Sequence, residues 1–150
     1  MPYRIEIVAT SAAPPEVVFE HLAVAEAWGV WARFPAKPVR EREGETTPNG
    51  EGAIRRIWPA REQVVAYDPP GHYSYIALSG LPTKDYRADV TFAPQPGGGG
   101  TTIRWQGRFE PKIPGTGPLI RLFLVQLLGR FARGVARHSE HCEPGCPAYR

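Results

Sequence analysis

The chain of 150 residues has few cysteines and no long apolar run, and each absence excludes a class of protein. Two cysteines cannot build the disulfide framework on which small secreted domains depend. The segment richest in apolar residues is interrupted by Arg121, Gln126 and Arg130, so no stretch reaches the roughly 18 apolar residues of a transmembrane segment. The first ten residues lack the apolar region of a signal peptide, and we therefore expect a cytoplasmic protein.

An excess of charge of one sign is also missing, because 18 Lys and Arg residues are balanced by 15 Asp and Glu residues. A protein that binds nucleic acid would show a basic stripe with interleaved aromatic residues, or a recognisable module, and we find neither. We therefore expect no nucleic acid partner. The length is typical of one domain that can bury a substantial core.

What the sequence does have is a last third that predicts one long helix, from Gly117 to His141, because its apolar residues recur at helical spacing. Leu122 and Val125 lie off the main stripe, so the first half of the helix is apolar on nearly every side. Two explanations stay open, namely packing against neighbouring loops and a wall or mouth of a ligand cavity. The stripe itself consists of Ile120, Leu124, Leu127, Phe131, Val135 and His138.

The residues before this helix predict a strand, two short helices and six more strands. Residues 3–9 alternate as a half-buried strand does, Pro15 begins a helix to about Leu22, and a second helix around residues 24–31 ends before Pro35 and Pro38. Strands joined by short turns form an antiparallel sheet, and the long helix is the element that can cover its apolar face. The six further strands are expected at residues 38–45, 53–58, 62–67, 72–79, 85–93 and 102–110.

Several local sequences together resemble the START and Bet v 1 related (SRPBCC) superfamily. They are Ala13-Pro-Pro-Glu-Val-Val-Phe-Glu-His-Leu22, the pair Trp28 and Trp31, Gly50-Glu-Gly52, Tyr67-Asp-Pro-Pro70 and Gly100-Thr-Thr-Ile-Arg-Trp105. Within that superfamily the chain is most similar to bacterial members grouped as polyketide cyclase/dehydrase or lipid transport proteins. The resemblance implies an α+β helix-grip fold, in which a curved seven-stranded antiparallel sheet wraps around the long C-terminal helix. We assign residues 1–143 to one such domain and residues 144–150 to a flexible tail.

The resemblance also implies a deep cavity for a small hydrophobic ligand such as a polyketide, a lipid or a sterol-like molecule. Strand alternation and helix spacing indicate which side chains approach it, and aromatic rings with a polar tip suit a flat, partly oxygenated ligand. For each side chain taken alone, packing in the core is the alternative. The ligand-binding candidates are Trp31, Tyr73, Tyr75, Tyr86, Trp105, Phe109, Leu119, Phe123 and Leu127.

Evidence for catalysis is weaker, because the sequence has no Gly-x-Ser-x-Gly motif and no carboxylate pair at acid/base spacing. Arg55 and Arg56 must point to opposite faces of their strand, so one of them points toward the cavity. There an arginine could polarise a ketone or stabilise an enolate, as the aromatase/cyclases of the superfamily are thought to do. We take Arg56 and Tyr86 as the catalytic candidates. A surface position, or a salt bridge to Glu62 or Glu51, is the alternative for the arginine.

The two cysteines, Cys142 and Cys146, lie close in sequence to His138 and His141, a set that could coordinate zinc in principle. The spacing matches no standard zinc finger, His138 falls on the buried stripe of the helix, and Pro144-Gly145 is typical of a frayed end. We therefore expect no metal and no cofactor, and a reduced or adventitiously oxidised cysteine pair.

Three functions are compatible with these features. The first is binding of a small hydrophobic ligand, and the second is a polyketide cyclase, aromatase or dehydrase that acts in the same cavity. The third is a protein interaction module that uses exposed apolar residues around Leu122 and Val125. We expect a monomer or a homodimer.

Overall fold

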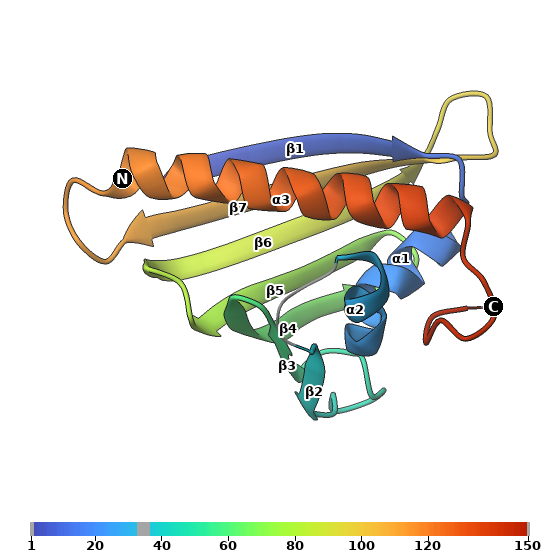
Figure 1. Ribbon diagram of the computed structural model, residues 1–150, viewed down its shortest axis with the longest axis horizontal. Coiled ribbons are helices and arrows are strands. Elements are labelled where there is room, and N and C mark those ends of the chain that lie inside the picture. The colour runs from blue at the N-terminus through green and yellow to red at the C-terminus, as the bar shows by residue number, and fades with distance from the viewer. Residues whose placement is uncertain (1, 33–36, 150) are drawn as a thin grey trace.

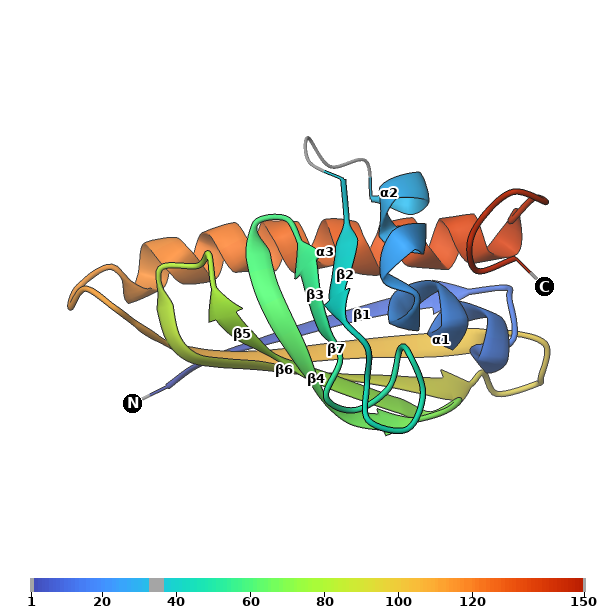
Figure 2. The same cartoon turned by 90° about the horizontal axis from the view of Figure 1, so that it is seen from below.

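The protein is one antiparallel sheet that curls around a long C-terminal helix, as a computed structural model shows (Figures 1 and 2). The structure describes residues 2–32 and 37–149. Pro35, which the sequence places at the end of the second helix, lies outside the described residues. The helix-grip fold with seven strands, two short helical segments and one long helix is confirmed.

Seven strands form the sheet in the order β1–β7–β6–β5–β4–β3–β2, and each neighbouring pair is antiparallel. Strands β2 to β7 follow one another as hairpins, whereas β1 pairs with β7 and so brings the first strand beside the last. The strands are β1 (Tyr3–Ser11), β2 (Val39–Arg42), β3 (Ile54–Ile57), β4 (Ala60–Asp68), β5 (His72–Ser79), β6 (Thr83–Pro94) and β7 (Thr101–Pro111).

Two short helices lie together at one end of the sheet (Figure 1). Helix α1 (Pro15–Ala23) begins with a proline, whose fixed φ suits a first helical position, and ends where Val24 is extended. The second helix of the sequence prediction is divided into a 3₁₀ turn (Ala25–Ala27) and the single α-helical turn α2 (Trp28–Trp31). The indole nitrogens of Trp28 and Trp31 donate to the carbonyl oxygens of Leu22 and His21, at 2.8 and 3.2 Å, and so hold α2 against α1.

Helix α3 (Gly117–Glu140) crosses the sheet and lies along β1 and β7 (Figures 1 and 2). Its buried residues include Ile120, Leu124, Leu127, Phe131 and Val135, so these members of the predicted stripe face the core, whereas His138, the last member, is only half-buried. None of the helices in the described part of the chain combines the length and apolar character needed to cross a membrane.

The core lies between the inward face of the sheet and the three helices. Alternation along β6 and β7 directs Tyr86, Val90, Trp105 and Phe109 inward, and each of them is buried. Aromatic rings fill the end of the core beneath α1 and α2, where Trp28 contacts Trp31, Trp105 and Phe131 at centroid distances of 4.4, 6.1 and 5.0 Å.

Candidate functional site

An arginine and a glutamate form an ion pair inside this aromatic core. Arg55 of β3 lies opposite Glu62 of β4 in the strand ladder, and only 1% of the arginine and 4% of the glutamate are exposed. Nε and Nη2 of Arg55 both lie 2.9 Å from Oε1 of Glu62, and Nη1 donates to the carbonyl oxygen of Leu22 at 2.7 Å. The pair therefore connects two strands of the sheet to the end of α1.

Three aromatic rings surround the guanidinium of Arg55. Its Cζ atom lies 5.2 Å from the ring centroid of Trp28, 4.9 Å from that of Tyr73 and 5.8 Å from that of Tyr75. Such cation–π contacts become stronger when water is excluded. Because an arginine side chain stays protonated in proteins, the core contains a permanent positive charge.

The carboxyl group of Glu62 titrates near neutral pH. Burial raises its pKa, the attraction and hydrogen bond of Arg55 oppose that rise, and the result is a pKa of about 7. A carboxyl group with a pKa near the working pH can both accept and donate a proton. Of the two buried groups, Glu62 is therefore the one that can change its protonation state.

Three tyrosines extend the polar set around the ion pair. Burial raises the pKa of Tyr73, Tyr75 and Tyr86, so their hydroxyl groups stay protonated at neutral pH. The indole nitrogen of Trp105 donates to the hydroxyl of Tyr75 at 3.3 Å. The hydroxyl of Tyr73 is buried and has no hydrogen-bond partner within the described part of the chain. Nη2 of Arg55, which lies 2.9 Å from Glu62 in the ion pair, likewise has no hydrogen-bond partner in that part of the chain, so both atoms have an unused capacity to donate.

The structure brings together most, but not all, of the predicted ligand-binding residues. Trp31, Tyr73, Tyr75, Tyr86, Trp105, Phe109 and Leu127 are buried in one core. The Tyr75 ring lies 6.1 Å from Tyr86 and 6.4 Å from Trp105. Leu119 and Phe123 were expected to approach this core, but they are 71% and 45% exposed on the outer side of α3. Contact of any of these residues with a ligand stays a prediction.

Alternation predicts that one of the two adjacent arginines points inward, and Arg56 is the catalytic candidate, but the structure places Arg55 inside and Arg56 outside. The side chain of Arg56 is 63% exposed, and its Nε lies 3.6 Å from Glu41 on the outer face of the sheet. Arg55 occupies the interior, in the salt bridge to Glu62 that the sequence analysis gave as an alternative. The missed signal was in the neighbouring strand, where Glu62 alternates in step with the apolar residues Ala60 and Val64. A register that pairs Glu62 with Arg55 identifies which arginine is inside.

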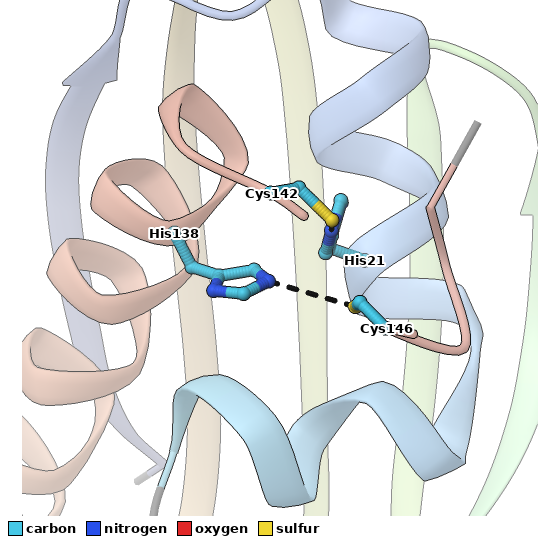
Figure 3. Close-up of side chains that lie close together, drawn as sticks. All are labelled: His21, His138, Cys142 and Cys146. Atoms are coloured by element: carbon cyan, nitrogen blue, oxygen red, sulfur yellow. Dashed lines mark hydrogen bonds between the residues drawn. The ribbon is translucent and has the colours of Figure 1, made fainter. Parts of the chain in front are cut away.

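Residues with metal-binding side chains meet at the C-terminal end of α3 (Figure 3). His21, His138, Cys142 and Cys146 each direct one nitrogen or sulfur atom into a common space. The sequence pointed to three of them but not to His21, which comes from α1. His141, the fourth residue of the sequence set, is not part of the cluster and has a 76% exposed side chain.

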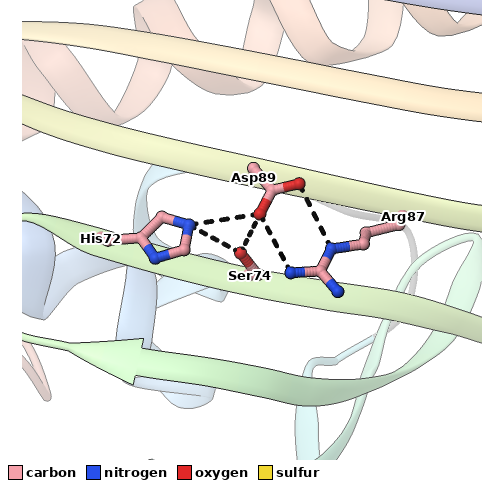
Figure 4. Close-up of polar contacts among 4 residues, drawn as sticks. All are labelled: His72, Ser74, Arg87 and Asp89. Atoms are coloured by element: carbon pink, nitrogen blue, oxygen red, sulfur yellow. Dashed lines mark hydrogen bonds and ion pairs between the residues drawn. The ribbon is translucent and has the colours of Figure 1, made fainter.

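A second polar cluster lies on the outer face of the sheet and ties β5 to β6 (Figure 4). Asp89 accepts hydrogen bonds from Ser74 and Arg87, and it lies 3.2 Å from Nε2 of His72. Burial raises the pKa of Asp89, but the hydrogen bonds from Ser74, Arg87 and His72 outweigh it and leave the pKa below its ordinary value. Ser74 is fully buried, so its hydroxyl cannot reach a substrate as a nucleophile would. The cluster is therefore a connection between strands.

A hollow of about 600 Å³ opens on the same outer face, over β1, β6 and β7. Its lining is mostly charged and includes Arg4, Glu6, Arg87, Asp89, Arg108 and Arg121. Such a lining offers little apolar surface, so the hollow does not suit a hydrophobic ligand. The interior cluster of Arg55, Glu62 and the tyrosines is the remaining candidate site. Its side chains are packed together in the core, so a cavity among them stays a prediction.

Comparison with known proteins identifies the relatives of this chain. The family model described as "Polyketide cyclase / dehydrase and lipid transport" matches residues 3–140. A START superfamily protein from Mycobacterium smegmatis has a similar structure, with a TM-score of 0.78, 12% identity and coverage of 93% of this chain and 99% of that chain.

Two further solved structures share the fold. A protein from Thermobifida fusca has a TM-score of 0.72 at 20% identity, over 93% of this chain and 95% of that chain. Norcoclaurine synthase from Thalictrum flavum, solved with dopamine and hydroxybenzaldehyde, has a TM-score of 0.68 at 13% identity, over 95% of this chain and 89% of that chain. No curated protein gives a significant match. At these identities the structural likenesses show the fold alone.

Proposed function

The chain belongs to the polyketide cyclase/dehydrase and lipid transport family, whose fold typically binds hydrophobic ligands, and we propose that it binds a flat, partly oxygenated one in its interior. Candidate ligands are polyketide-like or sterol-like molecules. The binding surface is the aromatic cluster between the sheet and α3, and its polar contacts are Arg55 and the hydroxyl of Tyr73. The observation that carries this proposal is the buried Tyr73 hydroxyl, which lacks a hydrogen-bond partner within the described part of the chain, next to a buried arginine.

Stability alone does not explain why the Arg55–Glu62 ion pair and the unpartnered hydroxyl of Tyr73 are buried in the core. An unpartnered buried hydroxyl costs about 1–3 kcal/mol, and a buried ion pair is often no more stabilising than apolar residues of the same volume. A carbonyl or hydroxyl oxygen of a ligand would give Tyr73 its missing acceptor. The faces of Tyr75, Tyr86 and Trp105 would bury the rings of such a ligand.

The test is displacement of a fluorescent probe. The environment-sensitive dye 1-anilinonaphthalene-8-sulfonate is bound to the full chain, and emodin, deoxycholate and oleate are then added as aromatic, sterol-like and fatty-acid competitors. We expect emodin or deoxycholate to displace the dye at lower concentration than oleate, and to raise the melting temperature. The proposal fails if none of the competitors displaces the dye or shifts the melting temperature.

Adjacent residues supply matched variants for this experiment. Tyr73→Phe removes one hydroxyl and should weaken competitor binding by roughly 2- to 10-fold. Arg55→Met should weaken it by about tenfold or more, since hydrogen bonds to charged groups are stronger. Arg56→Met removes the neighbouring exposed arginine and should change nothing. Equal effects of Arg55→Met and Arg56→Met would place the binding surface elsewhere.

One observation favours a second function, catalysis of a polyketide cyclisation or dehydration. Glu62 has a pKa of about 7 and lies against a permanent positive charge, as a general base paired with an enolate-stabilising group would. The test is the product profile of a poly-β-ketone thioester, which also cyclises spontaneously, with and without the protein. Altered products that Glu62→Gln abolishes and Arg56→Ala retains would support it. An unchanged profile would leave ligand binding as the function.

A further inference from the structure

Four side chains at the end of α3 form a cluster that the ligand site does not use (Figure 3). The ligand atoms of His21, His138, Cys142 and Cys146 all lie within 4.8 Å of one another. Nε2 of His21 lies 3.1 Å from Sγ of Cys142, and Nε2 of His138 lies 3.5 Å from Sγ of Cys146. We propose that these four residues bind one zinc ion as a closed structural site.

The separations agree with tetrahedral coordination. Zinc–sulfur bonds of about 2.3 Å and zinc–nitrogen bonds of about 2.0–2.1 Å place tetrahedral ligand atoms roughly 3.3–3.8 Å apart. The two contacts of 3.1 and 3.5 Å lie near this range, and the other separations, all within 4.8 Å, need a contraction of at most about 1 Å. A set of two sulfur and two nitrogen ligands in this geometry is typical of zinc.

The ring of His21 is already oriented as a metal ligand. Its Nδ1 lies 2.8 Å from the carbonyl oxygen of Val17, one helical turn earlier in α1. A hydrogen bond there places the proton on Nδ1 and leaves the Nε2 lone pair directed at the cluster, an arrangement found for most zinc-bound histidines.

The backbone after α3 returns the second cysteine to the site. Cys142 and Cys146 are separated by three residues, within the two to four that are common between paired zinc cysteines. Gly145 adopts a positive φ of 102°, and the amide of Cys146 donates to the carbonyl oxygen of Glu143 at 3.3 Å. The turn continues to Ala148, which is buried. A zinc ion here would join α1, the end of α3 and residues 142–149.

The direct test is metal content and uptake by the full chain. The protein is purified with a phosphine reductant, without chelators, and its zinc is measured by elemental mass spectrometry. We expect one zinc per chain, and exchange for Co²⁺ should give the visible bands and the near-ultraviolet thiolate charge-transfer band of tetrahedral sulfur-ligated cobalt. A chain that contains no zinc and takes up neither Zn²⁺ nor Co²⁺ would overturn the proposal. A Cys142–Cys146 disulfide that persists under the reductant would also overturn it.

Two histidines three residues apart provide the matched variants. His138→Asn should lower zinc affinity by more than the roughly 10- to 100-fold typical of second-shell changes, and it should alter the cobalt spectrum. His141→Asn, at the exposed neighbouring histidine, should leave both unchanged. Equal zinc binding by the two variants would contradict the assignment. Competition of the unaltered protein with a chromogenic zinc chelator measures affinity without any substitution, so a variant that fails to fold does not remove the test.

Discussion

The two halves of α3 differ in what covers them. In the second half, Phe131 contacts Trp28, Trp31 and Trp105, and the buried hydroxyl of Ser11 donates to the carbonyl oxygen of Ala136 at 2.7 Å. In the first half, Ile120 and Leu124 pack on the sheet while the opposite side remains exposed and apolar. The second half of this continuous helix therefore anchors the fold, whereas the first half exposes apolar side chains on one of its sides.

The exposed apolar side of the first half consists of Leu119, Leu122 and Phe123, which are 71%, 57% and 45% exposed. For its apolar character the sequence predicts one of two covered positions, against loops or in the wall of a cavity, whereas the third candidate function predicts exposed apolar residues around Leu122 and Val125. The structure places these three side chains in neither position. They form an apolar surface on the side of the helix that faces away from the sheet.

The strongest test of the contrast is a pair of phenylalanine substitutions, one in each half. Phe131→Ala should lower the free energy of unfolding by about 3–5 kcal/mol, because it leaves a cavity among the tryptophans. Phe123→Ala removes the same atoms from an exposed site and should cost less than about 1 kcal/mol. Urea unfolding monitored by circular dichroism measures both. Similar losses for the two variants would show that the halves are equally anchored.

The ion pair beneath the second half makes stability depend on pH. The folded protein keeps a proton on Glu62 up to a pKa of about 7, whereas the unfolded chain loses it near 4.5, so this group's contribution is present at low pH and lost as pH rises through 7. The free energy of unfolding of the wild type should therefore fall, relative to Glu62→Gln, by about 3 kcal/mol between pH 4 and 8. Parallel curves of stability against pH for the two proteins would refute this prediction.

Two glycines within α3 test how closely its second half is packed. A Cβ atom at Gly134 would lie 3.2 Å from a ring carbon of Trp31 and 3.3 Å from its carbonyl oxygen, so Gly134→Ala should cost about 1 kcal/mol. The three atoms nearest to a Cβ at Gly129 all belong to the guanidinium of Arg133, at 2.9–3.5 Å, and this end of a flexible side chain can shift, so Gly129→Ala should stabilise the helix by up to about 1 kcal/mol. Thermal unfolding compares the two variants. A gain in stability for Gly134→Ala would mean that Trp31 moves aside easily.

The smallest effect is expected in the exposed part of the first half. Leu122→Gln should change the free energy of unfolding by no more than about 0.5 kcal/mol, because Leu122 is exposed. Unfolding is measured at two protein concentrations, since a homodimer formed through this surface would make the wild type more stable at the higher one. If the free energy of unfolding depends on protein concentration for the wild type but not for Leu122→Gln, the surface is a dimer interface.

Much of the fold could be predicted because its signals are local. Alternation in residues 85–93 and 102–110 anticipated β6 and β7 with the correct inward faces, and helical spacing anticipated the buried stripe of α3. The prolines and glycines between strands marked the hairpins. These features depend on neighbours a few positions apart, which sequence spacing reports directly.

The candidate sites depended on distant partners and were harder to predict. Alternation showed that one of Arg55 and Arg56 points inward, but the choice required the register of β3 on β4, in which Arg55 faces Glu62. The histidine and cysteine cluster required His21, more than a hundred residues before His138, and only the packing of α1 against α3 joins them. Leu119 and Phe123 resembled cavity residues because an apolar residue beside a helical stripe gives no local signal of whether its side chain is covered or exposed.

The pairing of β1 with β7 has a consequence for how the chain acquires its structure. Tyr3 pairs with Phe109 and Ser11 with Thr101, so the first strand has no sheet partner until about a hundred further residues have been made. During synthesis the N-terminal segment stays unpaired until the hairpins from β2 to β7 have formed. Contacts so distant along the chain slow folding, because the intervening loop must close before they can form. We therefore expect β1 to join the sheet last. Until then the unpaired edge of β7 is the surface most exposed to pairing with another chain on the ribosome.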